Sequence, residues 1–186
     1  MSKHYKIAVI VGSLRAASLN KKLANALTKL APDNLHFEFI SIGDLPHYNE
    51  ELEAEVPAAW SAFRSEMNEV DGVLFVTPEY NRSVPGFLKN AIDVGSRPYG
   101  KSVWDRKPAA IVSSSPGALA AFGANHHLRQ SLVFLNMPTM QQPEAYIGGV
   151  NKLLSEEGEI SNEDTKSFLT TFITAFGGWI ERHDDY

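Results

Sequence analysis

Short apolar runs alternate with helical patterns along the whole chain, and this alternation limits the fold more than any other feature. Residues 6–12 (K-I-A-V-I-V-G) and 73–77 (V-L-F-V-T) are almost entirely apolar, which is typical of parallel strands covered on both faces. Residues 35–41 (L-H-F-E-F-I-S) alternate and predict a second strand, which fits an edge of the sheet. Residues 108–113 predict a fourth strand, and residues 140–147 a weaker fifth. Helical spacing separates these runs, so we predict an α/β fold: a three-layer, doubly wound, five-stranded parallel sheet.

The expected helices are read from apolar residues that recur three or four positions apart. They cover residues 19–30, 57–70, 85–94 and 125–135, and a last helix carries Phe168, Phe172, Phe176 and Trp179. Ser161 with Asp164 resembles a capping box before that last helix. We interpret the aromatic stripe as core. The apolar residues of 85–94, together with Trp104, fit either core or a subunit interface.

Composition narrows the function. A length of 186 residues predicts one domain, residues 1–186. The chain has no Cys, which excludes disulfides, a thiol nucleophile and Cys-ligated metal, so any redox chemistry needs a bound cofactor. The net charge of −5 argues against nucleic-acid binding. The six His show no metal-binding spacing, so no metal site is expected. Neither a membrane span nor a signal peptide is expected, and the default compartment is the cytoplasm.

The segment after the first strand suits a phosphate. Residues 12–20 (G-S-L-R-A-A-S-L-N) place Ser13, Arg15, Ser18 and Asn20 between a strand and a helix N-terminus, where backbone N–H groups and the helix dipole favour an anion. The alternative is ordinary N-capping by Ser18 or Asn20. Neither the dinucleotide fingerprint nor the P-loop is present, which favours a mononucleotide monoester.

Two further strand ends carry polar loops. Residues 77–86 (T-P-E-Y-N-R-S-V-P-G) form a stiff loop whose backbone groups suit the edge of a flat heteroaromatic ring, with Tyr80 as a ring neighbour. Residues 113–117 (S-S-S-P-G) are small and rich in donors. The alternative for residues 77–86 is a plain proline-rich turn, and the alternative for residues 113–117 is a flexible loop. Together, three such loops at successive strand ends indicate a ligand site.

The motifs G-S-L-R-x-x-S-x-N at 12–20 and T-P-E-Y-N-x-S-x-P-G-x-L-K-N-A-I-D at 77–93 resemble the NAD(P)H-dependent FMN reductases, especially bacterial quinone, chromate and azo reductases. The resemblance covers about residues 7–176. It implies a flavodoxin-like fold with strand order 2-1-3-4-5, non-covalently bound FMN, and a homodimer or homotetramer with the flavin near the subunit interface.

The resemblance also implies roles for individual residues. The FMN phosphate would be held by Ser13, Arg15, Ser18 and Asn20. The isoalloxazine would be lined, mainly by backbone groups, by Pro78, Glu79, Tyr80 and Asn81. The ribityl and ring side would be closed by Ser113, Ser114, Ser115 and Gly117. Arg82 and Arg97 are candidates for attracting the dinucleotide or an oxyanion, with surface or interface positions as the alternative. The family often has Trp where this chain has Val94, and residues 95–104 are its own.

The implied activity is hydride transfer from NAD(P)H to bound FMN, followed by transfer of two electrons to a small-molecule acceptor such as a quinone, chromate, an azo compound or a flavin. No side chain is expected to be catalytic, because the flavin does the chemistry. The alternative is a flavodoxin-type electron carrier without its own NAD(P)H turnover. Such carriers are usually more acidic than this chain.

Overall fold

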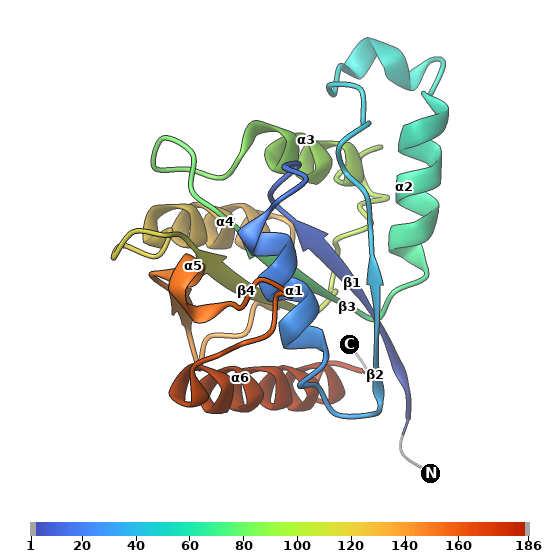
Figure 1. The fold of residues 1–186 in the computed structure, drawn as a ribbon. Coiled ribbons are helices and arrows are strands. Elements are labelled where there is room, and N and C mark those ends of the chain that lie inside the picture. The colour runs from blue at the N-terminus through green and yellow to red at the C-terminus, as the bar shows by residue number, and fades with distance from the viewer. Residues whose placement is uncertain (1–2, 185–186) are drawn as a thin grey trace.

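Five parallel strands form one sheet in the order β2-β1-β3-β4-β5 (Figure 1). The computed structural model describes residues 3–184. The strands are β1 (Tyr5–Val11), β2 (Leu35–Phe39), β3 (Gly72–Thr77), β4 (Ala109–Ser114) and β5 (Ala145–Ile147). Every neighbouring pair is parallel, in register from Tyr5 opposite Leu35 to Ser114 opposite Ile147. The doubly wound sheet and its strand order are therefore confirmed.

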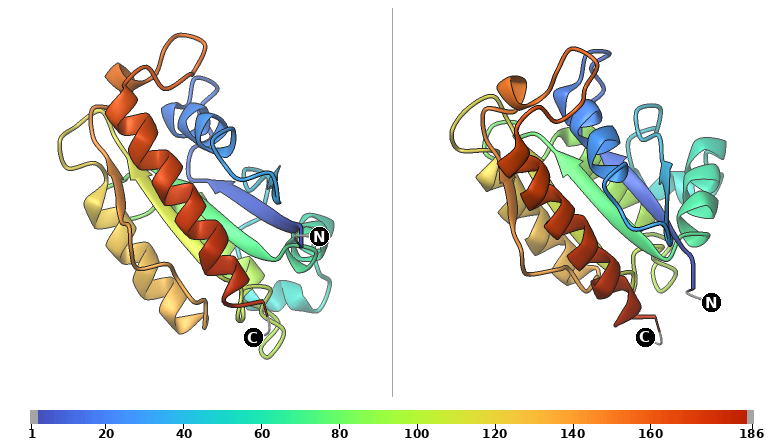
Figure 2. Two further views of the ribbon diagram at one scale, coloured as in Figure 1. Left: turned by 90° about the horizontal axis from the view of Figure 1, so that it is seen from below. Right: turned by 60° about the horizontal axis from the view of Figure 1, so that its bottom comes forward.

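Helices cover both faces of the sheet. They are α1 (Leu19–Thr28), α2 (Ala58–Asn68), α3 (Gly86–Gly95), α4 (Phe122–Phe134), α5 (Val150–Leu153) and α6 (Glu163–Glu181), with a 3-10 turn, η1 (Glu50–Glu53). Helices α1, α5 and α6 pack on one face and α2, α3 and α4 on the other (Figures 1 and 2). No helix within residues 3–184 is both long and apolar enough to cross a bilayer.

The two faces explain why the strands are apolar without alternation. In β1, Ile7 and Val9 point to the α1/α6 core, whereas Ala8 and Ile10 point to the α2–α4 core, and all four are buried. Every residue of β3 is buried as well. A strand with helices on both faces has no solvent side, so it needs apolar residues at successive positions.

The aromatic residues of the last helix and Trp104 are core. Phe172 and Phe176 are fully buried under the sheet. Trp104 is fully buried, and its indole N–H donates to Ile92 O at 2.9 Å. A Cβ at Gly95 would lie 2.5 Å from Trp104 Nε1, so glycine is needed where α3 meets this ring. The subunit-interface alternative for Trp104 is therefore wrong.

The last helix starts one residue away from the capping box expected at Ser161. Asn162 is the N-cap, and its Oδ1 accepts from Thr165 N at 2.8 Å. Ser161 Oγ donates instead to Leu153 O at 3.1 Å, which ties the preceding loop to α5. Ser161 and Asn162 both carry a side-chain oxygen that could cap the helix. The helix begins at Glu163, so the residue next to it, Asn162, is the N-cap.

Strand β5 and helix α4 also differ from their expected bounds. The strand expected over 140–147 is regular only at 145–147, because the chain before it meets β4 through a single bridge between Ala109 and Thr139. Helix α4 starts at Phe122 rather than near residue 125, after two residues in the left-handed region, Ala120 and Ala121 (φ 52° and 59°). Alanine gives no sequence signal for that conformation.

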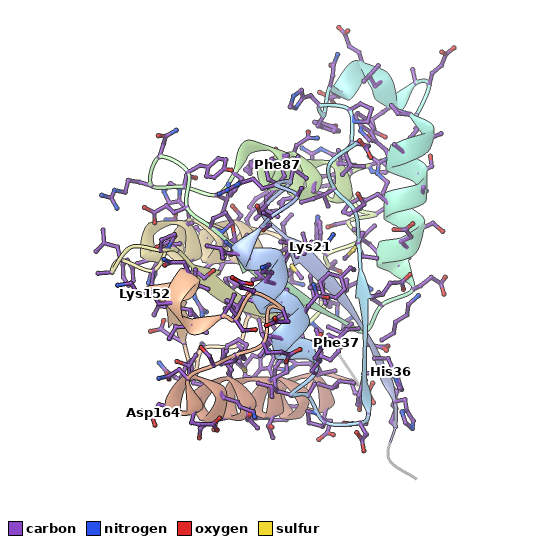
Figure 3. All side chains as sticks on the ribbon, viewed as in Figure 1. Lys21, His36, Phe37, Phe87, Lys152 and Asp164 are labelled. Carbon is purple, nitrogen blue, oxygen red and sulfur yellow. The ribbon has the colours of Figure 1, made fainter. Side chains whose placement is uncertain are left out.

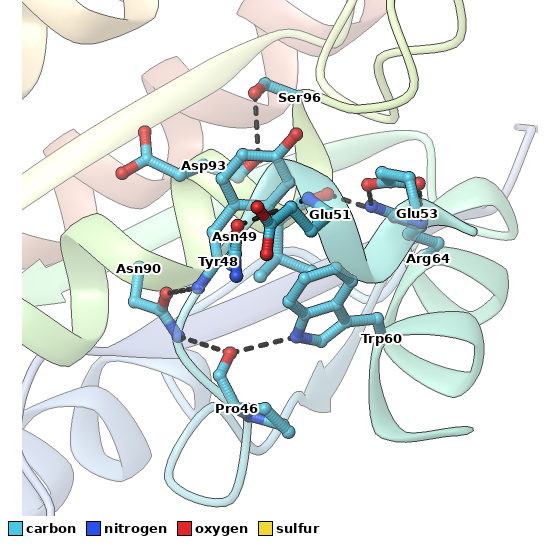
Figure 4. Close-up of polar contacts among 11 residues, drawn as sticks. Pro46, Tyr48, Asn49, Glu51, Glu53, Trp60, Arg64, Asn90, Asp93 and Ser96 are labelled. Carbon is cyan, nitrogen blue, oxygen red and sulfur yellow. Dashed lines mark hydrogen bonds and ion pairs between the residues drawn. The ribbon is translucent and has the colours of Figure 1, made fainter. Parts of the chain in front are cut away.

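The segment between β2 and α2 is attached to α3 through the Asn of the K-N-A-I-D motif (Figure 4). Asn90 is buried; its Oδ1 accepts from Tyr48 N at 2.8 Å, and its Nδ2 donates to Pro46 O at 3.1 Å. Trp60 Nε1 donates to the same carbonyl at 2.9 Å. Asn90 therefore orders a long connection rather than contacting a ligand.

Candidate functional site

The carboxyl ends of β1, β3 and β4 enclose a cavity of about 220 Å³. Its lining residues are Ser13, Arg15, Ser18, Leu19, Asn20, Pro78, Glu79, Tyr80, Ser114, Ser115, Pro116 and Val150. Loops far apart in the sequence meet here because parallel strands end at the same edge of the sheet, on either side of the point where the strand order reverses. Most of the residues expected at a cofactor site are thus brought together. Asn81, Ser113 and Gly117 are not in the lining.

The β1–α1 loop presents unused hydrogen-bond donors. The backbone N–H groups of residues 13–17 donate to no other described residue. Ser18 is the N-cap of α1, with its Oγ accepting from Lys21 N at 3.1 Å, so the capping alternative describes this side chain correctly. Its own hydroxyl proton is still available to a ligand. Free N–H groups at the start of a helix form an anion site.

Gly12 allows this loop to lie close to β3. A Cβ at this position would come within 2.5 Å of Thr77 Oγ1, so no side chain fits between β1 and β3 here. The glycine that opens the motif at 12–20 therefore serves the close packing of two strand ends, from which both site loops depart.

Arg15 is the cation of the cavity. Its side chain is exposed, and it forms no ion pair with any described residue. Lys21, on the first turn of α1, lies beside the same loop and lines an adjacent groove with Arg15 (Figure 3). The guanidinium is therefore free to pair with an anionic ligand.

Asn20 and Ser114 connect two walls of the cavity. Ser114 Oγ donates to Asn20 Oδ1 at 2.9 Å in a buried contact. Asn20 therefore has a structural partner as well as a place in the lining. The bond holds the first turn of α1 against the end of β4.

The β3–α3 loop is a tight hairpin turn. Tyr80 and Ser83 exchange backbone hydrogen bonds of 2.9 and 3.0 Å, and Asn81 and Arg82 between them both have positive φ (50° and 66°). Positive φ at both central positions is the type I′ arrangement, which Asn tolerates well. The turn places Asn81 at its tip, outside the cavity, while Pro78, Glu79 and Tyr80 remain in the wall.

The Glu79 carboxylate is used within the protein. Its Oε2 accepts from Ala124 N in the first turn of α4 at 3.1 Å, and its Oε1 lies 3.0 Å from Arg82 Nη1. Any contact between this residue and a ligand therefore falls to its backbone. Sequence reasoning missed the side-chain contact, because nothing local links residue 79 to residue 124.

Ser113 lies outside the cavity lining and makes buried hydrogen bonds to α4 and to the segment that leads into it. It is fully buried, donates through Oγ to Ala120 O at 2.9 Å, and accepts from Asn125 Nδ2 at 3.3 Å. Ser113 and Ser114 are the last two residues of β4, so their side chains point to opposite faces of the sheet. Gly117 lies in the loop beyond, and its carbonyl accepts from Ser115 Oγ at 3.1 Å.

Three lining residues were not expected: Leu19, Pro116 and Val150. Leu19 and Pro116 are immediate neighbours of expected residues. Val150 comes from α5, which follows β5 and has no polar motif. An apolar residue gives no sequence signal for a binding role, so only the fold reveals it.

The two candidate arginines for the substrate have different positions. Arg82 stands at the hairpin with 74% of its side chain exposed. Arg97 follows the far end of α3, which has 10 residues and is about 15 Å long. It lines a separate hollow of about 430 Å³ with Tyr99 and Phe134. Arg97 is therefore not in the cavity of its own chain.

The donor set of the cavity fits the phosphate and polyol of FMN. The β1–α1 loop offers free N–H groups, hydroxyls and one guanidinium for a phosphate. Ser114, Ser115 and Asn20 offer polar groups beside it. The N–H group of Glu79 donates to no other described residue, so the second wall has a free donor for the edge of a ring.

Comparison with known proteins agrees with this geometry. The family model "NADPH-dependent FMN reductase" matches residues 5–152. A quinone reductase of Pseudomonas putida is 58% identical over 182 residues, which is 97% of each chain. A 2-hydroxy-1,4-benzoquinone reductase of a Burkholderia species is 46% identical over 175 residues, 94% of this chain and 96% of the relative.

A solved structure has the same fold at close similarity. The flavoenzyme NAD(P)H:(acceptor) oxidoreductase FerB of Paracoccus denitrificans superimposes with a TM-score of 0.92 at 45% identity, covering 96% of this chain and 98% of that chain. The matched family model spans both motif loops that line the cavity. This chain therefore belongs to the family of NADPH-dependent FMN reductases.

Proposed function

We propose that this protein reduces quinones with electrons from NAD(P)H, through FMN bound non-covalently in the cavity at the ends of β1, β3 and β4. The observation that carries the proposal is the meeting of a free anion site, a free guanidinium and a second loop with the free N–H group of Glu79 in one cavity. The quinone is favoured among acceptors because relatives at 58% and 46% identity are named quinone reductases. Chromate and azo compounds have no comparable support.

Each wall has its own role in this proposal. Ser13, Arg15, Ser18 and Asn20 hold the phosphate. Pro78, Glu79 and Tyr80 lie along the ring, and Ser114 and Ser115 beside the ribityl chain. Asn81, Ser113 and Gly117 shape the loops without lining the cavity. Tyr80 is half exposed at the mouth, where its ring would contact the flavin or an incoming quinone.

The protein supplies position and electrostatics. When bound, FMN accepts a hydride from NAD(P)H and delivers two electrons to the acceptor. The chain orients both partners and directs fixed N–H groups at the places where negative charge develops. The ionisable residues in the lining are Arg15, Glu79 and Tyr80, and the Glu79 carboxylate already has partners. No side-chain acid or base is needed for hydride transfer.

We propose that Arg82 attracts the anionic dinucleotide, because its guanidinium is largely exposed beside the mouth of the cavity. A homodimer or homotetramer is the proposed assembly. Large apolar side chains, including Tyr99 and Phe134, stand exposed around the hollow that contains Arg97. Arg97 would then contact an acceptor only in the site of a second copy. Light scattering after size exclusion tests this, and a 20.5 kDa monomer contradicts it.

The function is tested by steady-state turnover. The flavin-loaded protein is mixed with NADH or NADPH and with benzoquinone, chromate or an azo dye in parallel. The proposal predicts the highest kcat/KM with benzoquinone. Flavin-loaded protein that does not turn over NAD(P)H with any acceptor would support the electron-carrier alternative instead. The proposed cytoplasmic location, where NAD(P)H is supplied, is tested by cell fractionation.

A further inference from the structure

We propose that the Glu79 side chain is a positioning residue for the flavin site, because its carboxylate fixes the β3–α3 loop to the N-terminus of α4. The proposal rests on the proposed function, since it takes the cavity to be the FMN site. It gives the carboxylate a role separate from any backbone contact that residue 79 makes with the flavin.

The carboxylate is held by two partners in a sheltered place. Only 14% of the Glu79 side chain is exposed, although it belongs to a surface loop. Oε2 accepts from Ala124 N at 3.1 Å and Oε1 lies 3.0 Å from Arg82 Nη1. A sheltered carboxylate is stable only when hydrogen bonded, and the positive end of a helix favours its charge.

Helix α4 has no cap of its own. Its N-cap residue is Ala121, which has no side-chain oxygen. The N–H groups of a first helical turn need partners from outside the helix. Glu79 supplies one from 45 residues earlier in the chain. This single hydrogen bond therefore satisfies a first-turn N–H group of α4 and also holds the β3–α3 loop in place.

Two further features of α4 fit the same contact. A Cβ at Gly123 would lie 2.9 Å from Glu79 Oε2 and 3.1 Å from Arg82 O, so a larger residue would push the loop away. One turn later, His127 Nδ1 lies 2.8 Å from Ser83 Oγ, at the other end of the hairpin. The loop is thus attached to α4 on both sides of its turn.

The consequence concerns cofactor affinity. Pro78 and Tyr80 line the cavity, and these residues and the Glu79 N–H keep fixed positions only while the hairpin is held. A loop that is ordered before binding spares the ligand the entropy of ordering it. Without the Glu79 carboxylate, FMN would have to order the hairpin itself and would bind more weakly.

The test uses the full-length chain, freed of flavin and titrated with FMN and with riboflavin by quenching of flavin fluorescence. Glu79→Ala is expected to raise both dissociation constants by about tenfold and by the same factor, because the loop does not contact the phosphate. Glu79→Gln keeps an oxygen for Ala124 N and is expected to restore most of the affinity. Glu53→Ala is the matched control: it removes a carboxylate 2.6 Å from Arg64 Nη2, away from the cavity, and should leave both constants unchanged.

A double-mutant cycle separates positioning from general destabilisation. Gly123→Ala is expected to weaken flavin binding about as much as Glu79→Ala, and to cost less in the Glu79→Ala background, because the contact with Glu79 Oε2 is then gone and only the 3.1 Å contact with Arg82 O remains. Additive losses would overturn the proposal, as would wild-type affinity in Glu79→Ala. If Glu79→Ala does not fold, the other two variants decide. The proposal is supported if Glu79→Gln binds flavin with nearly wild-type affinity and Gly123→Ala binds it more weakly, and any other pattern rejects it. Wild-type protein that binds no flavin refutes the proposed function itself.

Discussion

Replacing Arg15 with Ala tests the phosphate site most sharply. The guanidinium is exposed, has no ion pair with a described residue and lines the cavity beside the free N–H groups of residues 13–17. A hydrogen bond to a charged group contributes about 1.5–3 kcal/mol, and exposure places this one toward the lower end of that range. We therefore expect a loss of about 2 kcal/mol, which is about 30-fold in the dissociation constant. The backbone donors remain, so binding weakens without being abolished.

The assay compares FMN with riboflavin, which lacks the phosphate. Arg15→Ala should weaken the binding of FMN and leave the binding of riboflavin unchanged. The preference for FMN over riboflavin then falls by the same factor of about 30. Arg15→Lys is the matched variant, because it keeps the charge but loses the planar pair of donors. Its affinity for FMN should lie between those of the wild type and Arg15→Ala. The contribution should also shrink as salt rises. Equal losses for both flavins, or no loss for FMN, would refute the assignment of the phosphate to this loop.

Three further predictions concern stability and ionisation. Gly12→Ala should destabilise the fold by about 1–3 kcal/mol in urea denaturation, since its Cβ would meet Thr77 Oγ1 at 2.5 Å, while Gly86→Ala, which meets nothing within 4 Å, should not. Trp104→Ala should cost about 3–5 kcal/mol, because the ring is fully buried and its N–H is paired with Ile92 O; a loss below about 1 kcal/mol contradicts its core role. Burial, assisted by Glu144, raises the pKa of Tyr146 to about 12, so the stability that its neutral phenol contributes is present below pH 10 and lost between pH 10 and 12. Tyr146→Phe should lose less stability than the wild type across that window, and identical losses would contradict the shift.

The architecture could be predicted because its signals are local. Continuous apolar runs identify strands that are covered on both faces, whereas the alternating run at 35–41 identifies β2, which lies at the edge of the sheet with an exposed side. All five strands lie within or next to the runs expected for them. The strand order needed the family resemblance, because periodicity does not distinguish between doubly wound topologies. The three polar loops follow strands, and strand ends converge at one edge, so most lining residues could be named without coordinates.

What could not be predicted depends on contacts between distant segments. The Ser13–Asn20 loop carries local cues, but the partner of Glu79 is 45 residues away and is a backbone N–H, which has no sequence signature. Ser113 and Ser114 are adjacent and both fully buried, but the pleat points their side chains to opposite faces, so only Ser114 reaches the cavity wall. The charge of Arg97 made it a reasonable candidate. Only the length of α3 shows that Arg97 cannot reach the cofactor cavity of the same chain.

The central claim is that this cavity holds FMN and passes electrons from NAD(P)H to a quinone. The most direct measurement is the visible absorbance of the purified protein, after addition of FMN and removal of the excess, followed through addition of NADPH and then benzoquinone without oxygen. The account predicts a flavin spectrum at one FMN per chain that bleaches with NADPH and returns with benzoquinone. A protein that retains no flavin would contradict the site, and a flavin that neither nicotinamide dinucleotide can bleach would contradict the reductase.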